Sequence, residues 1–184
     1  MPKIKIDKNI FGFPMPVVLI GTEVNGKANF FTVAWVMKFD YAPAKIGFIS
    51  GKEHYSNQGI IKNKTFSVNL PSQKQVKQTD YCGIYSGKKT DKSKVFEIEQ
   101  GSLKGTPMIK GAPVCLECRL EKTIDVDGDY LFVGKVINAY GEKSCFTKCK
   151  PNMNKIAPFM YTSPDNQYWS LGKPIAKAWD IGKI

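Results

Sequence analysis

The sequence predicts a mainly β fold, a barrel-like sheet with a few short peripheral helices, in a single domain. The strongest signal is a pair of long strands, 114–126 and 130–140, joined at the turn-forming pair Asp127-Gly128. Helical patterns are few and short, and no Pro- or Ser-rich linker divides the 184 residues. Hydrophobic residues make up 42% and charged residues 23% of the chain, which are ordinary values for a globular protein with one core.

Four further strands are expected before the long pair, at 17–23, 28–36, 45–50 and 65–70. Asn25-Gly26 provides the hairpin turn between the first two, because this dipeptide favours the backbone that tight hairpins need. The turn-like sequence Tyr41-Ala42-Pro43 precedes the third strand. Pro71 ends the fourth, since proline cannot donate to a strand ladder.

Three short helices are expected, at 56–63, 72–82 and 90–96. Ser72 and Gln75 have the spacing of a capping box, and Gly83 stands where a left-handed helix terminator belongs. Thr90 is the expected cap of the last helix.

The remaining segments of the second half lack clear periodicity. The polar segment 145–155 is predicted to be a loop. From about 158 to 184 the chain has aromatic landmarks at Tyr161, Trp169 and Trp179, and we expect an arm or a closing strand there.

The charge balance raises the question of a nucleic-acid partner. The formal net charge is +11, from 27 basic and 16 acidic residues. Arg119 is the single arginine, and arginine is the side chain that best reads bases and phosphates. The lysines are scattered, which favours a solvated surface, but a lysine-rich nucleic-acid-binding β-barrel without redox activity stays an alternative.

The N-terminus has no apolar stretch of the kind found in signal peptides, and no segment reaches the length of a membrane span. We therefore expect a cytoplasmic protein without a membrane partner. Its five cysteines are an odd number, which favours free thiols. Cys115 and Cys118 have zinc-like spacing but lie in a predicted strand, where residues three apart point to opposite faces, so no metal site is predicted.

No catalytic residue is predicted. His54 is the single histidine, and no serine lies in a nucleophile-elbow motif. Three segments could instead bind a ligand. Polar residues at 54–57 stand at the start of a predicted helix, where a phosphate could bind. The loop 83–90 contains glycine, serine and lysine, and it offers amides and ammonium groups to an anion. The segment 29–35 mixes polar and aromatic residues that suit a flat heteroaromatic ring.

These segments belong to an ordered set of motifs that spans nearly the whole chain. The set includes Asn29-x-x-Thr32-x-Ala34-Trp35, Tyr55-Ser56, Phe66-Ser67-Val68-Asn69-Leu70-Pro71, Thr79-Asp80-Tyr81-Cys82-Gly83, Ser86-Gly87-Lys88-x-x-Asp91-Lys92, Pro113-Val114-x-Leu116-Glu117-Cys118, Phe132-Val133-Gly134 and Tyr168-Trp169-x-Leu171-Gly172. In this set the chain resembles the flavin reductase-like proteins with an FMN-binding split barrel, and among them the flavoredoxin group. It departs from the family pattern at Lys88, Ser93 and Asp129, where arginine, phenylalanine and histidine are common.

The resemblance implies a closed split β-barrel of Greek-key type, with residues 1–184 as one FMN-binding domain. It implies FMN as the cofactor, a homodimer, and either NAD(P)H or a redox protein as electron donor or acceptor, without nucleic acid. It leaves open whether the protein is an NAD(P)H-dependent flavin reductase or a non-catalytic electron carrier. The residues expected to bind the cofactor are Asn29, Phe31, Thr32, Val33, Ala34, Trp35, Ser50, His54, Tyr55, Ser56, Asn57, Ser86, Gly87, Lys88, Thr90, Asp91 and Lys92.

Overall fold

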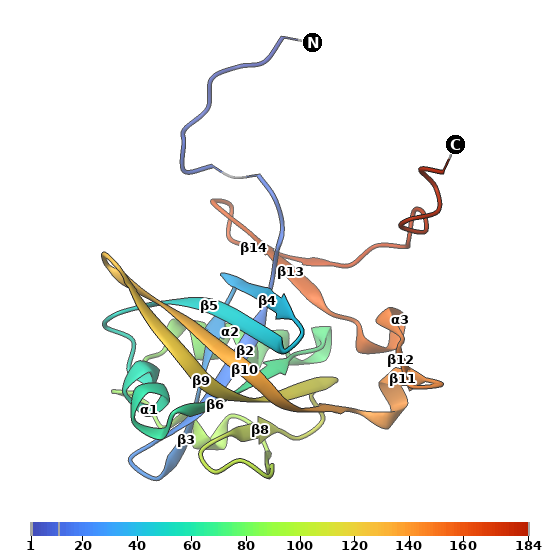
Figure 1. Ribbon diagram of the computed structural model, residues 1–184. Helices are drawn as coiled ribbons and strands as arrows, with labels where there is room; N and C mark the ends of the chain where they lie inside the picture. Colours follow the sequence, from blue (N-terminus) through green and yellow to red (C-terminus); the bar gives the residue numbers. More distant parts are fainter. Residues whose placement is uncertain (1, 11, 184) are drawn as a thin grey trace.

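The computed structural model describes residues 2–10 and 12–183 of the chain; Met1, Phe11 and Ile184, which fall within the predicted domain, lie outside the described residues. The fold is mainly β with a few short helices, as predicted (Figure 1). The strands are β1 (Met15–Pro16), β2 (Val18–Val24), β3 (Lys27–Val33), β4 (Val36–Tyr41), β5 (Ala44–Gly51), β6 (Thr65–Leu70), β7 (Ile98–Gln100), β8 (Pro107–Ile109), β9 (Val114–Val126), β10 (Asp129–Gly141), β11 (Phe146–Thr147), β12 (Lys150–Pro151), β13 (Phe159–Thr162) and β14 (Gln167–Ser170). The α-helices are α1 (Ser56–Asn63), α2 (Val76–Ile84) and α3 (Met153–Ile156), and short 3-10 turns occur at Gln73–Gln75, Lys92–Lys94 and Lys143–Cys145.

A seven-stranded antiparallel sheet forms the body, in the order β3-β2-β6-β9-β10-β5-β4. The two edge strands, β3 and β4, are joined by only Ala34 and Trp35, and the Trp35 carbonyl accepts a hydrogen bond from the Ile49 N–H of β5 at 2.9 Å. The edges of the sheet therefore lie near each other, because the chain passes from one to the other over two residues.

The sheet is buried on both faces where β2 and β3 cross the body. Ile20 and Phe31 belong to one core cluster, whereas their neighbours Leu19 and Phe30 belong to another on the opposite face. All four side chains are at most 7% exposed. Two hydrophobic faces on one pair of strands fix their register, since a shift by one residue would exchange the two sets.

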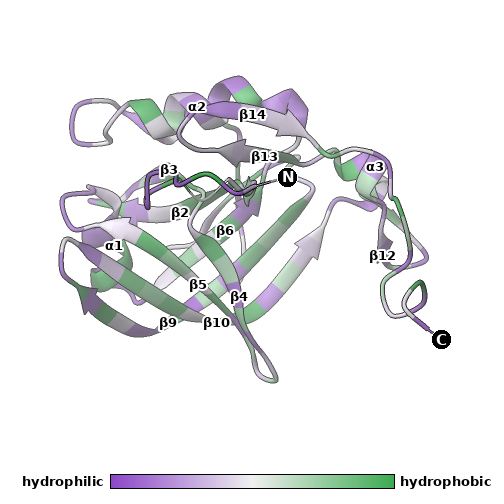
Figure 2. Ribbon diagram, turned by 90° about the horizontal axis from the view of Figure 1, so that it is seen from above, coloured by the Kyte–Doolittle hydropathy of each residue, from purple (hydrophilic) through white to green (hydrophobic). Residues whose placement is uncertain are grey.

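A smaller sheet, β1-β13-β14, lies across the body beside α2 (Figure 2). Tyr168 of β14 donates a hydrogen bond to the Asp80 carboxylate of α2 at 2.9 Å, which connects the two elements. The C-terminal segment predicted as an arm thus begins with two paired strands. Beyond Ser170 the chain runs beside α3, where residues 171–176 line a hollow with Gln73 and Asn152, and residues 2–10 leave the body at the other end (Figure 1).

Several predicted elements have the expected bounds. The strands 65–70 and 114–126 and the helix 56–63 are confirmed residue for residue. The capping box is also confirmed, because the Ser72 N–H donates to the Gln75 side chain at 3.0 Å.

Other expectations were wrong at the ends of elements. Gly83 does not terminate α2, which continues to Ile84 and ends where the Tyr85 N–H bonds the Tyr81 carbonyl. Asp91, and not Thr90, caps a single 3-10 turn in the region predicted as a helix, because its carboxylate accepts from the Ser93 N–H at 3.0 Å.

The predicted strand 28–36 is interrupted at Ala34 and Trp35, so that its last residue, Val36, already belongs to β4. The segment 145–155, predicted as a loop, contains the hairpin β11–β12 and the short helix α3. Both errors concern features of only two to four residues, the break at Ala34–Trp35 and the elements β11, β12 and α3. Such features are set by tertiary contacts and are too short for hydrophobic periodicity to reveal them.

A buried carboxylate connects the loop 101–106 to the large sheet. Glu117 of β9 is 0% exposed, and burial by itself raises the pKa of its carboxyl. Hydrogen bonds to the ionised form outweigh burial and lower the pKa to about 2. Its partners are the Leu103 N–H at 2.8 Å and the side chains of Ser102 at 3.0 Å, Thr106 at 2.9 Å, Asn138 at 2.8 Å and Tyr140 at 3.0 Å.

We expect Glu117→Gln to destabilise the protein at pH 7 by about 2–4 kcal/mol, because the amide turns a donor toward groups that are themselves donors. The ionised carboxylate contributes fully above its ordinary pKa of 4.5, and that contribution is lost as pH falls toward about 2. The cost of the substitution should therefore shrink in acid. Urea unfolding at pH 7 and at about pH 3.5 measures both values.

Glu121→Gln is the matched control, since Glu121 lies on the same strand but forms a partly exposed ion pair with Lys45 at 2.8 Å. Its cost should stay within about 1 kcal/mol. Equal costs for the two variants at pH 7 would contradict the role assigned to Glu117.

Candidate functional site

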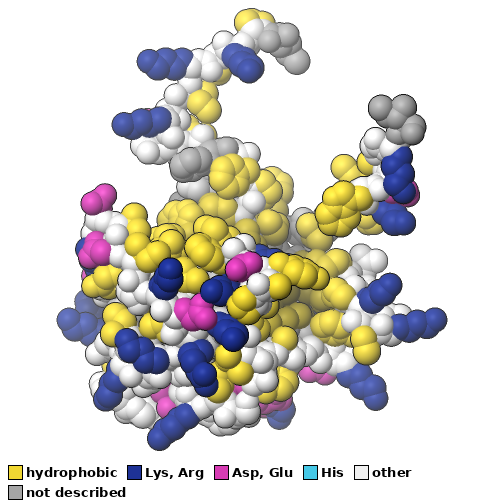
Figure 3. All heavy atoms as spheres, in the orientation of Figure 1, with side chains coloured by type: hydrophobic (Ala, Val, Ile, Leu, Met, Phe, Trp, Pro, Cys, Tyr) yellow, Lys and Arg dark blue, Asp and Glu magenta, His cyan; other side chains and the backbone are white. Residues whose placement is uncertain are grey.

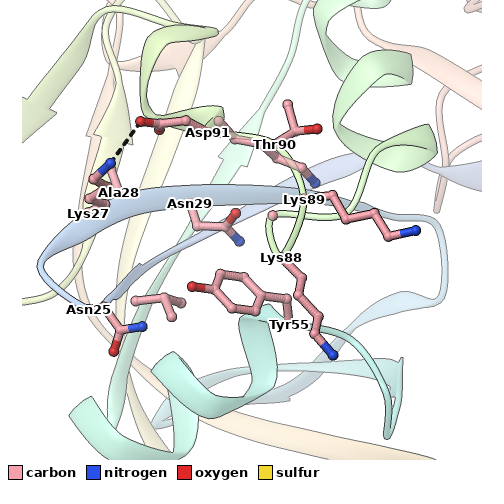
Figure 4. Close-up of a pocket in the computed structure, with 12 residues that line it drawn as sticks. Asn25, Lys27, Ala28, Asn29, Tyr55, Lys88, Lys89, Thr90 and Asp91 are labelled. Atoms are coloured by element: carbon pink, nitrogen blue, oxygen red, sulfur yellow. Dashed lines mark hydrogen bonds and ion pairs between the residues drawn. The ribbon is translucent and has the colours of Figure 1, made fainter.

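The three segments that the sequence singles out as ligand-binding meet in the structure. Residues of β3, of the start of α1 and of the segment 82–92 line two adjoining hollows, which share Tyr55, Gly87 and Lys92. The central hollow, of about 210 Å³, is lined by Phe31, Thr32, His54, Tyr55, Ser56, Cys82, Gly83, Ile84, Tyr85, Ser86, Gly87 and Lys92. The lysine hollow, of about 370 Å³, is lined by Val24, Asn25, Lys27, Ala28, Asn29, Tyr55, Gly87, Lys88, Lys89, Thr90, Asp91 and Lys92 (Figure 4).

Lys92 is a buried cation at the junction of the two hollows. It is 3% exposed, and its ammonium donates to the Phe30 carbonyl at 3.0 Å and to the Cys82 carbonyl at 2.7 Å. Among the described residues no carboxylate forms an ion pair with it, and burial lowers the pKa of its side chain. An ammonium has three N–H groups, so one remains for a ligand.

The start of α1 is fastened to β3 by a buried hydrogen bond. The Asn29 amide donates to the Ser56 hydroxyl at 2.6 Å, and both residues are at most 4% exposed. The Ser56 hydroxyl still has its own proton to donate. Ser56 is the first residue of the helix, as predicted, and Tyr55 before it supplies no side-chain cap. The N–H of the second helix residue, Asn57, donates to the His54 carbonyl at 3.1 Å.

The loop 86–91 approaches this pair so closely that only glycine fits at its centre. A Cβ at Gly87 would lie 2.1 Å from the Asn29 side-chain oxygen and 2.8 Å from the Tyr55 ring. The Lys27 ammonium pairs with the Asp91 carboxylate at 3.1 Å, which connects the loop to the β2–β3 hairpin (Figure 4). The Ser93 hydroxyl and N–H, together with Lys27, hold the pKa of the Asp91 carboxyl well below its usual range.

Most of the predicted site residues line one of these hollows, and five do not. Val33 is buried in the core, and Ala34 and Trp35 lie at the corner between β3 and β4, where Trp35 is 62% exposed. Ser50 and Asn57 are buried behind His54. The Ser50 hydroxyl contacts the His54 ring, and the Asn57 side chain contacts the Ser50 hydroxyl.

Sequence reasoning missed the contribution of the β2–β3 hairpin, from which Lys27 lines the lysine hollow. Ile84 and Tyr85 of the central hollow and Lys89 of the lysine hollow lie in the segment 83–90 that the sequence singled out, but they were not among the individual residues expected to bind the cofactor. Lys27 follows the Asn25-Gly26 turn directly, so a hairpin placed beside the loop would have pointed to it. The position of α2 against β3 is a tertiary fact without a local signal.

The cysteines are free thiols, as predicted. Cys82, Cys115, Cys118 and Cys145 are buried and Cys149 is exposed. Burial raises the pKa of Cys82 to about 11, so this thiol beside the central hollow stays protonated at neutral pH. Within residues 2–10 and 12–183, no group of three or more His, Cys, Asp or Glu side chains could hold a metal ion. Nor does this part of the chain contain a helix of the length and apolarity needed to span a membrane.

Comparison with solved structures finds close similarity over the full length. The flavoredoxin of Methanosarcina acetivorans is 44% identical, with a TM-score of 0.96 over 100% of this chain and 98% of that one. The flavoredoxin of Desulfovibrio vulgaris (Miyazaki F) is 27% identical, with a TM-score of 0.91 and full coverage of both chains. An FMN-binding protein from Thermus thermophilus shares the fold at 20% identity, with a TM-score of 0.82 over 96% of this chain and 98% of that one.

A family comparison agrees with these similarities. Residues 10–161 match the flavin reductase like domain, and this range contains both hollows and the whole seven-stranded sheet. The chain therefore belongs to the flavin reductase-like domain family, whose members bind flavin.

Proposed function

We propose that this protein binds FMN and serves as a redox flavoprotein of the flavoredoxin or flavin reductase kind. The observation that carries the proposal is Lys92, a buried cation with one N–H left for a ligand at a hollow without a carboxylate in its lining. Such a site favours an anion, because a charge is costly to bury unless an opposite charge or hydrogen bonds compensate it. Membership of the flavin reductase-like family supports flavin as the ligand that carries the anion.

The residues around the central hollow fit the ribityl phosphate of FMN. Lys92 and the Ser56 hydroxyl at the start of α1 would hold the phosphate, with Lys88 adding positive charge from the loop. A hollow of about 210 Å³ suits a phosphate and part of its chain but not three fused rings as well. The isoalloxazine would therefore lie along the β3–β4 corner, beside Thr32, Ala34 and Trp35.

The electron transfer itself is the chemistry of the bound flavin. This chain's own residues bind and orient the cofactor, and Thr32 shows how firmly its strand is held. The Thr32 hydroxyl donates to the Thr79 carbonyl of α2 at 2.5 Å, which fixes the face of β3 that lines the hollow. We also propose the closed split barrel that the family resemblance implies, and the short passage between β3 and β4 supports it.

The visible spectrum of the purified protein, with and without added FMN, tests the proposal. We expect flavin absorbance to be retained, or the fluorescence of added FMN to be quenched at micromolar protein concentration. If neither effect is seen, the proposal is wrong, and the alternative of a lysine-rich nucleic-acid-binding protein is favoured instead.

The redox partner divides the proposal into two roles. A reductase takes hydride from NADH or NADPH, whereas a carrier of the flavoredoxin type is reduced by a protein. Stopped-flow reduction by each nicotinamide cofactor separates them, because a carrier should be reduced by both much more slowly than an enzyme turns over.

The phosphate contact predicts a large effect at one lysine and a small effect at another. Lys92→Met should weaken FMN binding by about 1.5–3 kcal/mol, or roughly ten- to a hundredfold. Lys62→Met removes an exposed lysine from the same region and should change the binding free energy by no more than about 0.5 kcal/mol. Fluorescence titration measures both.

The melting temperature of each variant is recorded alongside, since the Lys92 ammonium also satisfies the carbonyls of Phe30 and Cys82. Equal losses of FMN affinity in two folded variants would mean that diffuse positive charge, rather than a specific contact, holds the phosphate.

We further propose a homodimer formed through β4. Alternate side chains from its corner onward are exposed and apolar, with Trp35 62%, Met37 50%, Phe39 48% and Tyr41 80% exposed, while Lys38 and Asp40 lie between them. Hydrophobic side chains also gather on the face below the two terminal segments (Figure 3). A second copy seated there would cover both this edge strand and a flavin ring lying at Trp35.

Sedimentation should give about twice the 20.6 kDa chain mass at micromolar concentration. Met37→Lys should shift the equilibrium toward the monomer by about tenfold or more, because it places a charge in a covered apolar surface. Ile124→Lys, at a 41% exposed position of β9, is the matched control and should leave the dimer intact. A monomeric wild-type protein would contradict the dimer.

A further inference from the structure

His54 is the single histidine of the chain, and two buried polar side chains lie behind its ring. Its Nδ1 lies 3.1 Å from the Ser50 hydroxyl, and that hydroxyl lies 2.7 Å from the Asn57 side-chain oxygen. Ser50 and Asn57 are 2% and 3% exposed, so water does not compete for these bonds. Phe31 lies against the ring, with centroids 5.9 Å apart.

The direction of this hydrogen-bond chain is set at its far end. The Asn57 side-chain nitrogen donates to the Gly51 carbonyl at 2.7 Å, and a reversed amide would place two acceptor oxygens against each other. The Asn57 oxygen therefore faces Ser50 and accepts the single hydroxyl proton. With its proton committed, the Ser50 oxygen can only accept from the histidine, so Nδ1 carries the hydrogen.

The remaining ring nitrogen is thereby fixed as an acceptor. A neutral imidazole has one N–H, so Nε2 of the neutral ring is bare. Nε2 lies 3.7 Å from the exposed Glu53 carboxylate, beyond hydrogen-bond distance, and the side chain is 50% exposed beside the central hollow. Within the described part of the chain, Nε2 makes no hydrogen bond.

The acceptor nitrogen Nε2 is the side of the ring that faces a ligand. Lys92 supplies a buried positive charge at the same hollow, and an anionic ligand group would be held there. A bare nitrogen in such a place attracts a hydrogen-bond donor and not an anion. The ligand group it suits is a hydroxyl, such as those of a polyol chain.

We propose that His54 accepts a hydrogen bond from a ribityl hydroxyl of the flavin through Nε2, and that Ser50 and Asn57 are positioning residues that fix its tautomer. The identity of the ligand rests on the proposed function, whereas the tautomer is a property of the free protein. Sequence reasoning grouped His54 with the phosphate contacts; this assignment gives it the sugar chain and leaves the phosphate to Lys92 and Ser56.

Nitrogen-15 NMR of histidine-labelled protein tests the tautomer directly, because the chain gives the spectrum of one imidazole. The flavin-free protein is measured at about pH 8.5, two units above the ordinary histidine pKa. We expect a protonated Nδ1 and an unprotonated Nε2. A protonated Nε2 in the neutral ring would overturn the proposal, whatever the protein's affinity for FMN.

Four probes then identify the ligand group. Riboflavin, which has the hydroxyl chain without the phosphate, and FMN should both shift the Nε2 resonance while Nε2 stays unprotonated. Lumiflavin, which lacks the chain, and inorganic phosphate should not shift it. A response to phosphate but not to riboflavin would overturn the hydroxyl contact. If FMN itself fails to bind by fluorescence, the proposed function fails, while the tautomer result remains valid.

Variants separate positioning from folding. Ser50→Ala should release the ring to a mixture of tautomers and weaken riboflavin binding about three- to tenfold. Ser144→Ala removes a hydroxyl from the 3-10 turn Lys143–Cys145, outside both hollows, and should leave the His54 spectrum and riboflavin affinity unchanged. A Ser50→Ala protein that melts normally and keeps the Nδ1–H tautomer would contradict the role of Ser50.

Discussion

The site depends on one buried ammonium group. Lys92 donates to the Phe30 carbonyl of β3 and to the Cys82 carbonyl of α2, and it stands at the end of the loop 86–91. The ammonium thus holds together β3, which lies 62 residues away at Phe30, and α2, which lies ten residues away at Cys82. Because no described carboxylate neutralises this charge, the fold retains a position where an anion is stabilised.

The rest of the site follows from that anchor. With β3 and α2 held together, the Asn29–Ser56 hydrogen bond sets the start of α1 beside the hollow, and Gly87 lets the loop close over it. Elsewhere in the molecule Glu117 uses the same principle with the opposite charge, since a buried ionised group gathers backbone and side-chain donors from the loop 101–106. Buried charges thus organise the irregular segments, whereas apolar packing organises the sheet.

The sequence predicts the regular elements well because their signals are local. Alternation over thirteen residues defines β9, and the spacing of Ser72 and Gln75 marks the start of the helical segment that follows β6. The break at Ala34–Trp35 was not predicted, because only pairing with β5 makes the chain turn there. For the site, the motifs identified the three segments that meet, yet the partners of Lys92 are backbone carbonyls, which no residue pattern reveals. Lys27 was missed because its position beside the loop 86–91 depends on tertiary packing.

The central claim is that this fold holds a phosphate group at Lys92, and the affinities of FMN and riboflavin test it most directly. The two ligands share the ring and the hydroxyl chain and differ only in the phosphate. If the buried ammonium and the start of α1 contact that phosphate, FMN should bind at least about tenfold more tightly than riboflavin, and the ratio should fall toward one in Lys92→Met. Equal affinities of the two flavins for the wild-type protein would contradict the account.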